Sequence, residues 1–326
     1  MYPCGMTTTT SMSIVWSRSI PFDGLNVRKA CANRHLPSAL QEEKHMAHDF
    51  KSILIGLVPA DDGEGAATAA VRFGIGLARR FGASVTFQAF MPHASAPYSA
   101  VGGFAAGIVA GENKRRRELV EAAAASARTA ADEAGLTCVM DLPDLPLDVL
   151  TERFNQQARL QDVTILDAGD DLLGNNRYAV EEALFNSGRP VIVVPKTEAS
   201  ADSQRIAIAW DGSARSARAV GDALPLLQSA RSVSVVVIGG EKDLSRIAPA
   251  SGLVGYLERH GVKSELVTLE AVGGDVAETL RQHVRDGAIE LVVMGAFVHS
   301  RFRQAVLGGV TRSLLQSSPV PLFLAY

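Results

Sequence analysis

Glycines follow a buried strand near the end of the chain, in a pattern that can bind phosphate. The apolar run Leu291–Met294 leads into Gly295, and a loop then leads to Gly308, Gly309 and Thr311. Backbone N–H groups of glycine and the positive end of a helix dipole both favour an anion at a helix start. The stretch therefore predicts a strand, a phosphate-binding loop and a helix. Glycines that only permit a turn would give the same pattern, so both interpretations stay open.

The composition suits packed helices and sheets and excludes several functions. The 326 residues are enough for two domains, and 47% are hydrophobic while only 6% are aromatic. A net charge of −3 gives no general attraction to nucleic acid or to an acidic membrane. No apolar run reaches the roughly 18 residues of a membrane helix. The cysteines Cys4, Cys31 and Cys138 are scattered without metal-ligand spacing. We therefore expect a reducing, cytoplasmic setting and no metal site.

Residues 1–49 differ from the rest of the chain. They contain the threonine run Thr7–Thr10 and show little periodicity. We interpret them as a disordered tail, as a transit peptide, or as sequence that precedes a true start at Met46, since a strand pattern follows Met46 directly.

From residue 50 onward, strand patterns alternate with helix patterns, and the whole alternation occurs twice. Residues 50–196 and 204–326 each read β-α-β-α-β-α-β-α-β, and a short polar linker separates them. Such alternation implies parallel strands with right-handed crossovers. We therefore predict an α/β fold of two tandem open, mostly parallel five-stranded sheets with helices on both faces. A ligand would bind at the carboxyl ends of the strands, where the strand order switches.

The pattern also predicts two helices and contains one charged run. The segment Met91–Gly111 is rich in small residues and is predicted to be an irregular excursion before a helix over Glu112–Ala134. One uninterrupted helix is predicted over Ser213–Gln228. The basic run Lys114–Arg117 could bind an anionic partner, although neighbouring glutamates favour an ordinary solvated helix face.

Three segments of the second half carry a resemblance to a known family. They are the strand Ile206–Trp210 with Asp211 after it, Gly273–Ala277 before a helix, and the loop that starts at Gly295. From Lys51 onward the chain resembles the universal stress protein family in its tandem two-domain form. The resemblance implies a Rossmann-like fold of the adenine nucleotide alpha hydrolase type.

Members of this family that bind ATP carry G-x-x-G, nine residues and then G-[ST] after the fourth strand. Here Gly295 and Gly308 match the first and last glycines of that pattern. Val298 replaces the middle glycine, and a β-branched residue disfavours the positive φ of a tight loop. Gly309 stands where Ser or Thr is expected, so it offers a backbone N–H but no hydroxyl.

Other residues near the loop could compensate for these departures. Thr311 could supply a hydroxyl group and Arg301 a positive charge for phosphate. The resemblance implies that Asp211 lies beside the nucleoside. The predicted cofactor-binding residues are therefore Asp211, Gly295, Arg301, Gly308, Gly309 and Thr311, and the implied cofactor is ATP.

The first half departs further from the family's pattern. Asp167, Asp170 and Asp171 follow its fourth strand and would repel phosphate. We predict that this half is a non-binding structural partner that packs against the second half as a pseudo-dimer. The final strand Val320–Ala325 offers a sheet edge for pairing between domains or subunits.

Three functions follow, from different classes. The first is a non-enzymatic stress-response protein that holds an adenine nucleotide in its second half and has an unknown protein partner. The second is a slow ATPase or another nucleotide-dependent enzyme on the same fold. The third is a ligand-free structural or interaction protein. The chain contains neither G-x-S-x-G nor G-x-x-x-x-G-K-[ST], so we assign no catalytic residue.

Overall fold

The computed structural model describes residues 49–59, 67–94, 103–169, 174–197, 199–239, 249–296 and 309–326. These residues belong to one compact unit, Met46–Tyr326. The predictions made for residues 1–48, including a start at Met46, lie outside the described residues.

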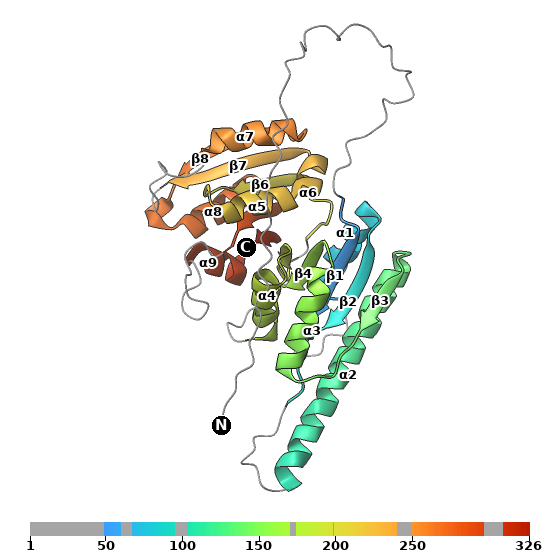
Figure 1. Ribbon diagram of the computed structural model, residues 1–326. Helices are drawn as coiled ribbons and strands as arrows, with labels where there is room; N and C mark the ends of the chain where they lie inside the picture. Colours follow the sequence, from blue (N-terminus) through green and yellow to red (C-terminus); the bar gives the residue numbers. More distant parts are fainter. Residues whose placement is uncertain are drawn as a thin grey trace, which may run out of the picture. The chain divides into compact units, whose positions relative to one another are not determined.

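Among the described residues, strands and helices alternate along the chain (Figure 1). The strands are β1 (Ser52–Leu57), β2 (Ser84–Ala89), β3 (Cys138–Asp141), β4 (Val163–Asp167), β5 (Val191–Val194), β6 (Arg205–Ala209), β7 (Ser232–Gly239), β8 (Ser264–Glu270), β9 (Leu291–Gly295) and β10 (Leu322–Ala325). The helices are α1 (Ala69–Phe81), α2 (Gly103–Glu133), α3 (Leu147–Arg159), α4 (Asn175–Asn186), α5 (Ala214–Asp222), α6 (Leu224–Ser229), α7 (Ala250–Arg259), α8 (Val276–Asp286), α9 (Gly309–Ser317) and the 3₁₀ turn η3 (Val272–Gly274).

The strands form one ten-stranded sheet in the order β3-β2-β1-β4-β5-β10-β9-β6-β7-β8. Strands within each half pair in parallel, and among the strands of the described ranges only β5 and β10 pair antiparallel. The predicted α/β class with mostly parallel strands is confirmed. The two five-stranded sets, which we expected as separate sheets, are joined because β10 uses its free edge to pair with β5.

Two hydrophobic cores lie on opposite faces of the sheet, because side chains alternate along a strand. On β1, Ile53 and Ile55 belong to the core under α1, whereas Leu54 belongs to the core under α3 and α4. The strand order reverses between β1 and β4 and again between β6 and β9. Each half therefore has its own switch point at the carboxyl edge of its strands, which is where such sheets bind ligands.

Two predicted helix boundaries were wrong. Helix α2 begins at Gly103 rather than Glu112, because the alanine-rich part of the excursion continues the helix despite its glycines. The helix predicted over Ser213–Gln228 is divided at Ala223 into α5 and α6, and Pro225 lies in the first turn of α6. Proline cannot donate a helical hydrogen bond and is favoured at a helix start.

No helix in the described ranges combines the length and apolarity that crossing a membrane requires.

Candidate functional site

A tight turn at the end of β6 orients Asp211. The backbone N–H of Ser213 donates to Asp211 Oδ1 at 3.0 Å, and Gly212 between them has φ +67°. A left-handed φ of this kind favours glycine. The chain then enters α5, where Ser213 Oγ accepts from Ser216 N at 3.1 Å as the predicted N-cap. Asp211 is therefore held in a defined position at the carboxyl edge of the sheet.

Gly295, the last residue of β9, presses against the first turn of α5. A Cβ added to Gly295 would lie 2.5 Å from the backbone N of Ser216 and 2.8 Å from the carbonyl carbon of Arg215. Contacts this short do not occur in folded proteins, so only glycine fits here without movement of the backbone. The turn that carries Asp211 and the end of β9 consequently meet at the start of α5, as the switch point requires.

Helix α9 supplies two of the remaining predicted residues. Gly309 is its first residue and is exposed, and an added Cβ there would meet nothing within 4 Å. Thr311, two residues later, is buried at 4% exposure. Arg301 and Gly308 lie outside the described residues, as does Val298. The structure thus brings Asp211 and Gly295 to one place and puts Gly309 at a helix start.

A second acid lies on the same edge and was missed by the sequence analysis. Glu270 ends β8 and is in register with Gly239, the last residue of β7. Its carboxylate oxygens lie 3.1 and 3.3 Å from where a Cβ on Gly239 would be. The pairing of a strand-ending acid with a strand-ending glycine is the signal that could have identified this contact.

Asp167 of the first half corresponds to Gly295 of the second half, since each residue is the last of the fourth strand in its half. Its Oδ1 accepts from Ala70 N at 2.8 Å at the start of α1, where Thr68 is the N-cap. The side-chain carboxylate of Asp167 therefore lies at the start of α1. Burial raises the pKa of the Asp167 carboxyl, although hydrogen bonds from Thr68 and Ala70 and the charges of Arg72 and Lys196 oppose the shift.

This raised pKa predicts a change in stability with pH. A carboxyl whose pKa is higher in the folded state stabilises the fold below its unfolded pKa, and this contribution is lost as pH rises through the folded value. Asp167→Asn cannot ionise, yet its amide oxygen can accept the same hydrogen bond from Ala70. We expect urea unfolding to show similar stabilities at about pH 3 and the variant at least as stable as the parent at about pH 7. A variant that is less stable at neutral pH would contradict this account.

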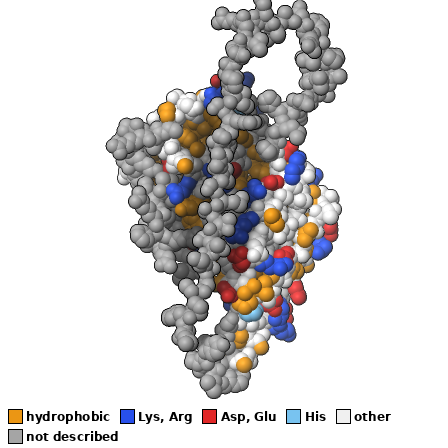
Figure 2. Space-filling model, in the orientation of Figure 1, with side chains coloured by type: hydrophobic (Ala, Val, Ile, Leu, Met, Phe, Trp, Pro, Cys, Tyr) orange, Lys and Arg blue, Asp and Glu red, His pale blue; other side chains and the backbone are white. Residues whose placement is uncertain are grey.

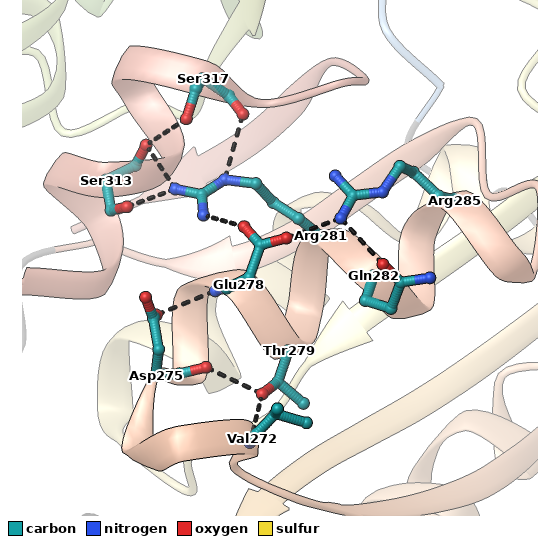
Figure 3. A network of polar contacts seen from close by, with 9 residues as sticks. All are labelled: Val272, Asp275, Glu278, Thr279, Arg281, Gln282, Arg285, Ser313 and Ser317. Atoms are coloured by element: carbon teal, nitrogen blue, oxygen red, sulfur yellow. Dashed lines mark hydrogen bonds and ion pairs between the residues drawn. The ribbon is translucent and has the colours of Figure 1, made fainter.

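A network of polar contacts joins α8 to α9 (Figure 3). The guanidinium of Arg281, on α8, donates through Nη2 to the carbonyl oxygen of Ser313 at 3.1 Å and through Nε to that of Ser317 at 3.2 Å. Glu278 accepts from Arg281 Nη1 at 2.8 Å, and hydrogen bonds from Arg285 and Arg281 lower the pKa of its carboxyl. The network fixes the end of α9 and therefore the direction in which its first residue lies.

A half-open cavity of about 110 Å³ lies in the first half, between α2 and the loops that follow β2 and β3. Arg117 Nη1 donates to Asp144 Oδ2 at 3.1 Å on its rim, and His93 Nδ1 lies 3.5 Å from Asp144 Oδ1. These side chains contact one another and the volume is small, so we do not assign a nucleotide to this cavity.

The two switch points, with glycine or acid at the ends of their strands, define an open doubly wound α/β protein that can take a ligand at its carboxyl edge. Residues 203–325 match the universal stress protein family. The second half of the chain is therefore similar to this family, and the resemblance inferred from the sequence is confirmed there.

Individual relatives agree with this assignment. A universal stress protein of Synechocystis sp. is 28% identical over 145 residues, which are 44% of this chain and 49% of that protein, so the match spans about half of the relative's length. The crystal structure of a universal stress protein from Archaeoglobus fulgidus has a TM-score of 0.60 at 14% identity, over 84% of this chain and 97% of that one. A functionally unknown protein of Pseudomonas aeruginosa has a TM-score of 0.50 at 13% identity, over 85% and 92%. The two structures show the fold.

Proposed function

We propose that this protein is a tandem universal stress protein that works without catalysis and holds an adenine nucleotide, ATP, at the carboxyl edge of its second half. The observation that carries the proposal is the meeting of Asp211 and Gly295 at the start of α5. The carboxylates of Asp211 and Glu270 can accept hydrogen bonds from sugar hydroxyls. The backbone N–H groups at the start of α9 can donate to phosphate.

The first half would have a structural role in this proposal. The Asp167 carboxylate takes the start of α1, and an acid there would repel a phosphate group. The antiparallel pairing of β5 with β10 supports the view that the halves pack as a pseudo-dimer. We place the protein in the cytoplasm, where ATP is abundant and thiols stay reduced, with a protein partner that reads the nucleotide state.

Nucleotide analysis of the purified full chain tests this proposal. We expect the supernatant of the denatured protein to contain ATP or another adenine nucleotide, and the stripped protein to bind ATP in a calorimetric titration. Release of phosphate with turnover would favour the slow ATPase. An absence of both bound nucleotide and binding heat would favour the ligand-free interaction protein.

Gly309→Glu is expected to weaken ATP binding by about tenfold or more, because it puts a negative charge at a helix start that would face phosphate. The added side chain meets no neighbour at its Cβ, so the melting temperature should stay near that of the parent. Gly309→Ala is the matched control, since it adds a Cβ without charge, and should bind ATP like the parent. Equal ATP affinities of the glutamate and alanine variants would show that phosphate does not lie at α9.

A further inference from the structure

The first turns of α2 project from the described part of the protein (Figure 1). The helix has 31 residues, which is about 46 Å, and the β2 strand beside it has only 6 residues. In Figure 1 the start of α2 extends past β3 and α3. None of residues 106–119 is buried, whereas the second half of the helix packs on the sheet through Val120, Ala124, Ala127 and Ala131.

This projecting start carries no charge. From Met91 to Gly111 the chain has no Asp, Glu, Lys or Arg, although these residues make up 21% of the whole sequence. Within α2 the segment Gly103–Gly111 consists of Gly, Ala, Phe, Ile and Val only. Ile108 is 58% exposed, and Cβ atoms added to Gly107 or Gly111 would meet nothing within 4 Å. From Ala106 to Gly111 the helix is therefore apolar, and every residue there except the half-buried Val109 is exposed, which is unfavourable in water.

Cationic side chains follow immediately. Lys114 and Arg115 have side chains that are 73% and 46% exposed, and they pair at 3.7 Å with Glu118 and Glu112 of the same helix. The segment 112–118 contains four basic and two acidic residues, so its net charge is +2, although Arg117 also pairs with Asp144 outside the segment. In Figure 2 the lowest coloured part of the molecule, the start of α2, is orange and white, and the charged side chains begin above it.

We propose that the start of α2 inserts into an anionic lipid surface, with the basic segment 112–118 at the headgroups. A docking groove on a protein would cover one face of the helix, whereas acyl chains cover all of its faces at once. The segment Gly103–Gly111 is about 13 Å long, close to half of the ~30 Å hydrocarbon core, so it fits one leaflet without crossing the bilayer. Basic residues directly behind an apolar segment match the order of acyl chains and anionic headgroups in a leaflet.

Flotation of the full chain with lipid vesicles tests the insertion. Vesicles of phosphatidylcholine and phosphatidylglycerol in equal parts should carry the protein upward, and vesicles of phosphatidylcholine alone should carry much less. High salt should reduce binding to the anionic vesicles because it screens the basic segment. If the parent protein did not float with the anionic vesicles, the proposal would be overturned.

Two glutamate variants separate the helix tip from a general effect of charge. Ile108→Glu should lower binding to the anionic vesicles by about tenfold or more, since the isoleucine is no longer buried in lipid. Leu160→Glu is the matched control, because Leu160 is 76% exposed and lies after α3, and it should bind like the parent. Both variants should keep the parent's melting temperature, as neither residue is buried. Equal losses in both variants, or a dimer of the parent that Ile108→Glu dissociates, would overturn insertion.

Discussion

Gly295→Ala is expected to lower the free energy of unfolding by about 3 kcal/mol, the upper end of the range for overpacked cores. The reason is that the added methyl group would meet backbone atoms of Ser216 and Arg215 at 2.5 and 2.8 Å, and backbone cannot rotate away as a side chain can. Either β9 or the first turn of α5 must move. Because the turn of Asp211 leads into α5, that movement should also disturb the candidate site. Urea unfolding of parent and variant measures the loss.

A glycine in open space gives the matched control. Gly107 lies inside α2, and an added Cβ meets nothing within 4 Å. Gly107→Ala should therefore raise the free energy of unfolding by about 0.5–1 kcal/mol, the gain from restricting the unfolded chain. If Gly295→Ala were as stable as the parent, the close approach of β9 to α5 would be wrong.

The close packing of Gly295 against α5 weakens the inference from this glycine to a nucleotide site. The sequence analysis took Gly295 as the first glycine of a phosphate loop, where the absence of a side chain lets phosphate approach. The structure gives an internal reason for the same residue, because the first turn of α5 fills the space that a Cβ would take. Gly295 therefore supports the fold as strongly as it supports a nucleotide, and Gly309 carries the sharper test.

Sequence patterns predicted the strands well because buried parallel strands are short apolar runs with turn residues at both ends. The run Val191–Val194 and the run Leu291–Met294 both lie within strands that match their predicted positions to within two residues. The start of α2 was missed because its glycines resemble a loop and because no Ser, Thr, Asp or Asn stands directly before Gly103 in the sequence. The break between α5 and α6 depends on one proline inside an otherwise helical pattern.

The site was harder to predict because its contacts join distant parts of the chain. Asp167 was predicted to repel phosphate, but the hydrogen bond that explains its position comes from Ala70, 97 residues earlier. Glu270 and Gly239 are brought together only by the pairing of β7 with β8. The sequence analysis found neither contact, because each depends on which distant segments the fold brings together.

Arg281→Ala is expected to lower the free energy of unfolding by about 2–3 kcal/mol. This is the typical cost of losing hydrogen bonds from a charged, largely buried side chain. The Arg281 side chain is only 11% exposed, and its guanidinium donates to the carbonyl oxygens of Ser313 and Ser317 near the end of α9. A positive charge there also stabilises the negative end of the helix dipole. The loss of stability should therefore be concentrated in α9. In the variant, hydrogen exchange of the α9 amides should speed up relative to the parent by more than exchange of the α8 amides does.

Arg285→Ala is the control that isolates this role. Arg285 pairs with the same Glu278 at 2.6 Å, but its side chain is 46% exposed and its other hydrogen bond stays within α8, to Gln282. Exposed pairs of this kind contribute about 0–1 kcal/mol, so Arg285→Ala should leave stability and α9 exchange nearly unchanged. If the two alanine variants lost equal stability, the Glu278 ion pairs and not the α9 carbonyls would be the main contribution. In that case α9 would be held by its apolar contacts alone, and Arg281 would have no part in directing Gly309 toward the carboxyl edge.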